Sequence, residues 1–112
     1  MKKSMGLTQQ KFNLKISYQD ILVERDKATF SKPSDSYGEF DHRKNSITIQ
    51  EDLSNLDYSC TLIHEVLHAI AYYYNLTQSG QPLDEENKEE IVINALSNGL
   101  VATLKENPIL LK

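Results

Sequence analysis

Apolar and polar residues alternate over residues 12–18, and a period of two is typical of a half-buried β-strand. The apolar run at residues 21–23 either extends this strand or begins a second strand that reaches Phe30. Residues 32–36 contain a proline, an aspartate and two serines, which predicts a turn-rich break after these strands. The first third of the chain is therefore predicted to be β-structure.

A β-hairpin is predicted in the next segment. Residues 37–40 and 46–50 have the composition of short strands, and the polar residues 41–45 between them have the composition of a loop. Because a hairpin pairs its strands antiparallel, these elements predict a small, mostly antiparallel sheet in the N-terminal half.

The pattern becomes helical after residue 53. A helix that is capped between Ser54 and Asp57 is predicted to run to about Tyr74. Its apolar residues form a wide arc on the helical wheel, made of Leu62, Ile63, Val66, Leu67, Ala69, Ile70, Tyr73 and Tyr74. This arc is centred roughly opposite His64 and His68, so we expect the histidines to lie away from the middle of the core-facing stripe.

A second helix is predicted after a loop at residues 79–82. Asp84 is the expected N-cap, Glu85 and Glu86 suit the first turn, and Pro108 marks the end. The apolar residues of this helix are Ile91, Ile93, Ala95, Leu96, Leu100 and Leu104. The predicted fold class is α+β, with a small sheet packed on two main helices.

The 112 residues suit a single domain, which we expect to span residues 11–112 after a flexible lead-in at residues 1–10. The net charge of −4 argues against a broad basic surface, so no direct nucleic-acid partner is expected. The single cysteine, Cys60, fits a reducing compartment, and no apolar stretch suits a signal peptide or a membrane span. We therefore expect a cytoplasmic protein with no membrane partner.

The segment His64-Glu65-Val66-Leu67-His68 matches the pattern H-E-x-x-H. In a helix, His64 and His68 lie one turn apart on one face, where both imidazoles can bind one zinc ion. Glu65 lies about 100° around the helix from His64, so it can reach a metal-bound water without being a ligand. The motif predicts a zinc site with Glu65 as the general base.

A catalytic zinc site needs a third protein ligand. The metzincin pattern H-E-x-x-H-x-x-G-x-x-H is excluded, because Ala71 and Tyr74 stand where that pattern has glycine and histidine. A carboxylate from the second helix is the alternative, and the first turns of this helix contain Glu85, Glu86, Glu89 and Glu90. The first two of these are expected to interact with the helix dipole.

Helical periodicity leaves two carboxylates open as the third ligand. Glu89 shares its face with Ile93 and Leu96, which indicates that it points toward packed residues. Glu90 shares its face with Asn94, which indicates a polar stripe that could line the site. The periodicity favours Glu90 over Glu89 only slightly.

These motifs together resemble the ImmA/IrrE-type zinc metallopeptidases and the small H-E-x-x-H domains encoded by phages and prophages. In that family the next helix reads roughly Glu-x-x-x-Asn-x-x-Ala, and Glu90 with Asn94 matches its Glu and Asn. The resemblance covers about residues 37–108. The chain lacks the DNA-binding helix-turn-helix and the Leu-Met-Pro helix ending of the fuller family, which argues against a self-contained role in transcription.

The resemblance implies a minimal zincin-like fold in which His64, His68 and Glu90 bind one Zn²⁺ and Glu65 is the general base. It also implies a peptidase whose substrate is a protein or peptide, with a phage or host regulator as one candidate. In zincins an edge strand beside the cleft often binds the extended substrate. The residues expected to form that strand here are Ile47, Thr48 and Ile49.

Four further side chains near the motif each have two interpretations. Cys60 lies one turn before His64, but three side chains spread over two helical turns do not easily converge on one ion, so packing is favoured. Tyr72 either contacts the tetrahedral intermediate or lines the cleft. Asn94 either orients a ligand or is a surface amide. His42, in the hairpin loop, is expected to be solvated, and contact with the substrate or an oxyanion is the less favoured interpretation.

The leading hypothesis is a zinc-dependent peptidase. An alternative is a catalytically silent zinc-binding interaction domain that keeps the same ligands. A third, weaker hypothesis is a SprT-like domain acting on DNA-bound proteins, against which the acidic charge balance counts. The sequence does not indicate an oligomeric state.

Overall fold

The computed structural model describes residues 11–26 and 37–111 of the chain. Within these ranges the protein has four β-strands and two long α-helices, so the predicted α+β class is confirmed. Three predicted features lie outside the described residues. These are the lead-in at residues 1–10, the turn at residues 32–36 and the end of the second strand at Phe30.

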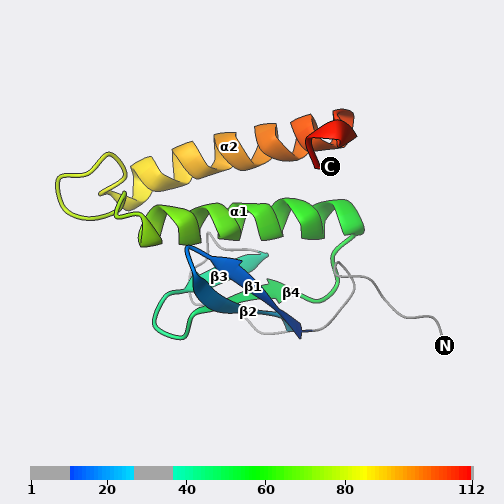
Figure 1. Ribbon diagram of the computed structural model, residues 1–112, viewed down its shortest axis with the longest axis horizontal. Helices are drawn as coiled ribbons and strands as arrows, with labels where there is room; N and C mark the ends of the chain where they lie inside the picture. Colours follow the sequence, from blue (N-terminus) through cyan, green and yellow to red (C-terminus); the bar gives the residue numbers. More distant parts are fainter. Residues whose placement is uncertain (1–10, 27–36, 112) are drawn as a thin grey trace.

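The four strands form one mixed sheet in the order β1-β2-β4-β3 (Figure 1). β1 (Lys11–Ile16) pairs antiparallel with β2 (Gln19–Asp26), and β3 (Gly38–Asp41) pairs antiparallel with β4 (Ser46–Gln50). The predicted hairpin is thereby confirmed. β2 and β4 lie side by side in parallel and join the two hairpins, so they are the central strands and β3 is an edge strand.

Tight turns set the boundaries of the hairpins. Ser17 and Tyr18 have φ angles of 51° and 68°, and two successive positive φ angles are what a two-residue hairpin turn requires. This turn separates β1 from β2 and so resolves the ambiguity over residues 12–23 in favour of two strands. In the second hairpin Asn45 has a φ of 51°, a conformation that asparagine adopts more readily than most residues.

The helix α1 (Asn55–Tyr73) lies between the sheet and α2 (Figure 1). The hydroxyl of Ser54 accepts a hydrogen bond of 3.1 Å from the backbone N–H of Asp57, so the predicted cap is confirmed. On the sheet side, Tyr58 and Ala69 are buried in the core. The other fully buried core side chains come from the central strands and are Ile21, Val23, Ile47 and Ile49. Burial of each such side chain contributes about 1.5–3 kcal/mol to the free energy of folding, and this stabilises the packing of α1 on the sheet.

The buried face of α1 matches the predicted apolar arc only in part, because Ala69 is buried and Leu62, Val66 and Tyr73 pack against the core. Ile70 and Tyr74, which belong to that arc, are exposed, whereas Thr61 and Glu65, which lie outside it, are buried. The reason is that α1 has two neighbouring layers, the sheet on one side and α2 on the other. Together they cover positions that the helix pattern did not mark and leave one flank of the arc in solvent.

The helix α2 (Glu86–Glu106) runs antiparallel to α1 on the side away from the sheet (Figure 1). The prediction that Asp84 is its N-cap is wrong, because the cap position is Glu85, whose side chain makes no capping hydrogen bond. The Asp84 carboxylate instead accepts hydrogen bonds from the backbone N–H of Gly80, at 3.1 Å, and from Lys88, at 3.5 Å. Asp84 therefore contacts both the interhelical loop and the first turn of α2 without capping a backbone N–H of that helix.

Only a narrow stripe of α2 is buried, and it contains Ile93 and Ser97. Ile91, Leu96 and Leu100 are exposed, although they belong to the apolar set of the predicted helix. The reason is that α2 is the outer layer and packs mainly against α1, so most of its circumference faces solvent.

The 3-10 helix η2 (Pro108–Leu111) follows α2, and Pro108 lies just beyond the end of that helix as predicted. In the parts of the chain that the structure describes, neither long helix has a stretch apolar enough to cross a membrane.

Gly38 allows β3 to lie directly against α1. A Cβ atom at this buried position would lie 2.7 Å from Cγ2 of Thr61 and 3.3 Å from both Cγ of Glu65 and the carbonyl oxygen of Thr48. We expect Gly38→Ala to lower the free energy of unfolding by about 1–3 kcal/mol, because a packed interior does not accept an extra methyl group without a shift. Urea unfolding measures this change.

The matched control is Gly99→Ala in the exposed part of α2, where an added Cβ would have no neighbour within 4 Å. Alanine is the better helix former, so this substitution should raise the free energy of unfolding by about 0.5–1 kcal/mol. If Gly38→Ala proved as harmless as Gly99→Ala, the close approach of β3 to α1 would be contradicted.

Candidate metal centre

The two histidines of the H-E-x-x-H motif lie on the side of α1 that faces α2. His64 and His68 are one helical turn apart, and their side chains are 18% and 13% exposed. The antiparallel course of α2 brings its second turn next to them, with Glu89 and Glu90 in contact. As predicted, neither histidine belongs to the core that α1 forms with the sheet.

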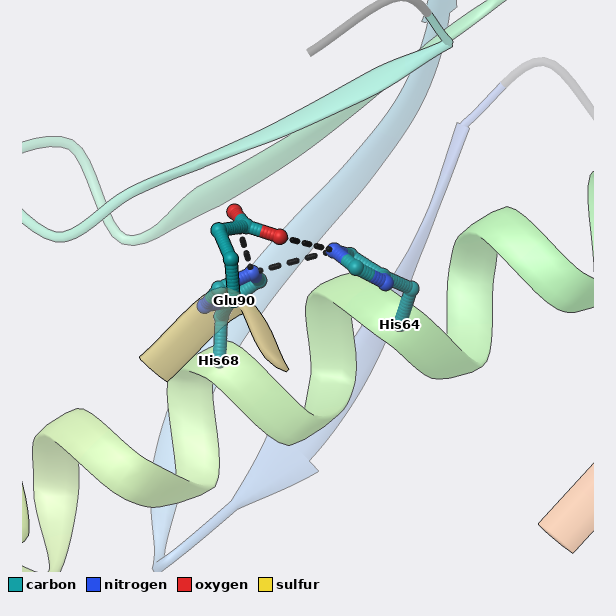
Figure 2. Close-up of side chains that lie close together, drawn as sticks. All are labelled: His64, His68 and Glu90. Carbon is teal, nitrogen blue, oxygen red and sulfur yellow. Dashed lines mark hydrogen bonds and ion pairs between the residues drawn. The ribbon is translucent and has the colours of Figure 1, made fainter. Parts of the chain in front are cut away.

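Three side chains converge from the two helices, as Figure 2 shows for His64, His68 and Glu90. Nε2 of His64 lies 3.0 Å from Nε2 of His68, and the carboxylate oxygens of Glu90 lie 3.4 Å from the first and 3.2 Å from the second. Ligands about 2.0–2.1 Å from a tetrahedral ion are separated by about 3.3 Å, so this triangle is close to the size of a tetrahedral metal site. The three residues could therefore hold a metal ion.

Glu89 occupies a different position from Glu90. Its Oε2 atom lies 2.6 Å from Nδ1 of His68, on the opposite side of the imidazole from the Nε2 atom that faces His64. If Nδ1 carries the proton and donates to Glu89, the lone pair of Nε2 points into the cluster. The structure thus brings Glu90 into the ligand triangle and places Glu89 where it orients His68.

The surroundings move the pKa values of the two imidazoles in opposite directions. Burial and the neighbouring His68 lower the pKa of His64 from its usual 6.5, and the attraction of Glu90 offsets this only in part. Burial also acts to lower the pKa of His68, but the hydrogen bond to Glu89 and the charges of Glu65, Glu89 and Glu90 outweigh it and raise that pKa. The lowered pKa favours the neutral form of His64, which is the form that binds a metal ion.

Glu65 lies beside the ligand cluster without belonging to it. The residue is only 4% exposed, and its side chain lies between the backbone of α1 and Gly38 of β3. Its carboxylate is near enough to His68 to raise the pKa of that imidazole, and it lines the same cavity as His68 and Glu90. A carboxylate in this place could take a proton from a water molecule bound to a metal ion in the cluster.

A cavity of about 290 Å³ opens on this side of the cluster. Its lining comes from the hairpin, from α1 and from the start of α2. The lining residues are Phe40, His42, Glu65, His68, Tyr72, Thr77, Glu86, Glu89 and Glu90. The lining therefore combines aromatic rings with carboxylates, and it includes His68 and Glu90 of the cluster.

A second hollow lies on the other side of the cluster and is lined by His64, Glu86, Asn87, Glu90 and Asn94. Asn94 therefore lies beside two of the ligands. In the described part of the chain, however, its side-chain amide makes no hydrogen bond to His64 or Glu90. Cys60 is half-buried and lies outside the ligand cluster.

The expectation that Ile47, Thr48 and Ile49 form the edge strand beside the cleft is wrong. These residues lie in β4, which is paired with β2 on one side and with β3 on the other, and Ile47 and Ile49 are fully buried. Strand β3 is the edge strand on this side of the sheet. The physical reason is the parallel pairing of β2 with β4, which a hairpin pattern does not reveal.

The cavity lining also includes Phe40, which sequence reasoning did not assign to it, and His42, for which contact with the substrate was the less favoured interpretation. Their distance from the motif in the chain is more than 20 residues, and no local pattern signals the contact. His42 was expected to be solvated. It is exposed, but its ring stacks on Tyr72 at the rim of the cavity.

Comparisons of the chain with protein-family models, with curated proteins and with solved structures find no match. The arrangement of side chains at this centre is therefore the feature that indicates a function. That arrangement consists of two imidazoles, one carboxylate ligand and one further carboxylate beside an open cavity.

Proposed function

We propose that this protein is a zinc-dependent peptidase with a minimal zincin-like fold. The observation that supports it best is the convergence of His64, His68 and Glu90 next to the buried carboxylate of Glu65. Two helices supply the ligands, and a cavity gives access to them from one side. The resemblance of the motifs to the ImmA/IrrE-type metallopeptidases favours the same reaction, with a regulatory protein as the substrate.

Zinc is the metal that best fits these ligands. Two imidazoles and one carboxylate form a common catalytic zinc site, in which a fourth position is left for water or substrate. The same ligands also occur in iron enzymes, so a metal analysis of the purified protein is part of the test. When bound here, zinc would polarise the scissile carbonyl group and acidify water.

Glu65 supplies the proton transfers of the proposed reaction. Its carboxylate takes a proton from the attacking water as the water oxygen bonds to the carbonyl carbon, and the π electrons of the carbonyl move to its oxygen. When the C–N bond breaks, Glu65 returns the proton to the leaving amine. Each step needs only a short movement of a proton, which agrees with the position of Glu65 at the wall of the cavity.

The outer edge of β3 is the proposed site for the substrate chain. In the described residues β3 pairs only with β4, and Phe40 of this strand lines the cavity. An extended peptide could add to this edge through backbone hydrogen bonds, which would bring its carbonyl groups past the metal centre. The substrate class is thus an extended segment of polypeptide.

The test is a cleavage assay on a mixture of peptides from digested protein, analysed by mass spectrometry. We expect protein with one equivalent of zinc to cleave peptides, a chelator to abolish cleavage, and added zinc to restore it. A chelator-insensitive activity would indicate a contaminating peptidase. Stoichiometric zinc without cleavage of any peptide would contradict the proposal.

A further inference from the structure

His42 is held at the rim of the cavity by an aromatic stack. Its ring lies on the ring of Tyr72 with a centroid separation of 4.5 Å and an interplanar angle of 20°. Tyr72 in turn contacts Phe40, at a centroid separation of 6.1 Å. The backbone N–H of Arg43 donates a hydrogen bond of 2.9 Å to the Asp41 carboxylate, which fixes the turn on either side of His42.

The hairpin that carries His42 is also tied to α1 at its far end. The hydroxyl of Tyr73 donates a hydrogen bond of 2.5 Å to the side-chain carbonyl of Asn45, and the ring of Tyr73 packs on Phe40. The loop between β3 and β4 is therefore fixed to the C-terminal turns of α1 at two points, Tyr72 and Tyr73. This arrangement holds the His42 ring in place although the residue is exposed.

The chemistry of the cavity lining leaves few groups that can stabilise negative charge. Four of the nine lining residues are carboxylates, which repel an oxyanion, and Phe40 has no polar side-chain atom. His68 is a proposed metal ligand. The remaining hydrogen-bond donors are His42, Tyr72 and Thr77.

Among these donors, His42 has the best position for a substrate that lies along β3. It directly follows Asp41, the last residue of this edge strand, whereas Thr77 lies in the loop between the helices. The imidazole stacks on the Tyr72 ring and reaches the cavity from the hairpin, whereas Tyr72 reaches it from α1. A peptide paired with β3 would bring a carbonyl group next to the imidazole.

We propose that His42 donates an N–H hydrogen bond to the oxyanion that forms on the scissile carbonyl, and that Tyr72 positions the imidazole by stacking. This inference rests on the proposed peptidase function. The carbonyl oxygen gains an electron pair when water adds to the carbon, and the hydrogen bond from His42 strengthens as that charge develops. When the C–N bond breaks, the electron pair returns to re-form the carbonyl group and the hydrogen bond weakens.

Three variants separate the imidazole N–H from the aromatic stack. His42→Phe keeps a ring on Tyr72 but removes the donor, and we expect it to lower kcat by about 100-fold with little change in KM. His42→Gln restores an N–H donor without the ring and should recover part of that loss. Tyr72→Phe keeps the ring beneath His42, and its loss of kcat should be smaller than that of His42→Phe. If Tyr72→Phe lowered kcat as much as His42→Phe or more, the assignment of His42 as the oxyanion donor would be overturned.

A binding measurement tests the same contact without turnover. A phosphinic peptide presents an anionic tetrahedral group in place of the scissile bond, and calorimetry on zinc-loaded protein gives its affinity. We expect His42→Phe to weaken this affinity by about 100-fold, while the affinity of an ordinary peptide, measured in a Glu65→Gln background, stays within about threefold. Equal affinities of wild type and His42→Phe for the phosphinic peptide would overturn the inference.

The two readouts distinguish failure of this inference from failure of the proposed function. If wild-type protein cleaves peptides and His42→Phe cleaves them equally well, His42 is not the oxyanion donor and the peptidase stands. If wild type cleaves no peptide and binds no phosphinic peptide, both proposals fall. A 100-fold loss of phosphinic-peptide affinity in His42→Phe supports the contact whatever the turnover rate.

Discussion

Replacement of Glu65 by glutamine is expected to lower kcat by about 10²–10⁴-fold while one zinc ion stays bound. Glutamine has nearly the shape of glutamate, so it fits the buried space beside Gly38 and Thr61. Its amide cannot accept a proton from water at neutral pH, and the attacking water then has no base. The measurement is the rate of peptide cleavage together with the zinc content of the same preparation.

The control for this experiment is Glu85→Gln, which removes the same charge from an exposed position outside the cavity. It should leave both the cleavage rate and the zinc content unchanged. The experiment also separates the peptidase from the alternative interaction domain. If Glu65→Gln retained full biological function with zinc bound, the protein would act through a zinc-stabilised surface rather than through hydrolysis.

Removal of the Glu90 carboxylate is the second change for which we expect a large effect. Structural zinc sites with four ligands bind with roughly 10–16 kcal/mol, so one ligand accounts for about 3–4 kcal/mol, or several hundred-fold in affinity. Glu90→Ala should therefore lose zinc during purification. Competition with a chelator of known affinity measures the dissociation constants of the wild type and the variant.

The matched variant is Glu89→Gln, one residue away on the same turn of α2. We expect a smaller loss of about 10–100-fold, because Glu89 contacts Nδ1 of His68 rather than the ion and the ring can keep part of its orientation without it. A greater loss in Glu89→Gln than in Glu90→Ala would reverse the roles that we assign to these neighbours. Retention of zinc in both variants would contradict a glutamate ligand from α2.

The local features of the fold could be predicted from the sequence because they depend on neighbours in the chain. The cap at Ser54, the extent of α1 and the hairpin of β3 and β4 follow from turn residues and from periods of two and 3.6. The boundary between β1 and β2 was harder to predict. Ser17 and Tyr18 are not typical of a turn with positive φ, so the sequence left this segment open.

Features that depend on packing between layers were predicted less well. The apolar arc of α1 omitted Thr61 and Glu65, which the sheet and α2 cover in the folded protein. The apolar residues of α2 include Ile91, which is 69% exposed, because this helix has a neighbour on one side only. A helical wheel shows how side chains are distributed around the helix. The number of neighbouring layers that pack against the helix is a property of the whole fold.

The H-E-x-x-H segment shows how this division applies to the site. The sequence by itself determined that His64 and His68 share a helix face and that Glu65 lies beside them, because backbone hydrogen bonds fix positions within one turn. Tertiary structure decided that Glu90 completes the triangle while Glu89 contacts Nδ1 of His68, since the packing of two helices selects the carboxylate that lies between the two imidazoles. It also decided that β3 rather than β4 is the edge strand and that His42 stacks on Tyr72 at the cavity. These contacts join segments far apart in the chain, and no period within either segment encodes their distance.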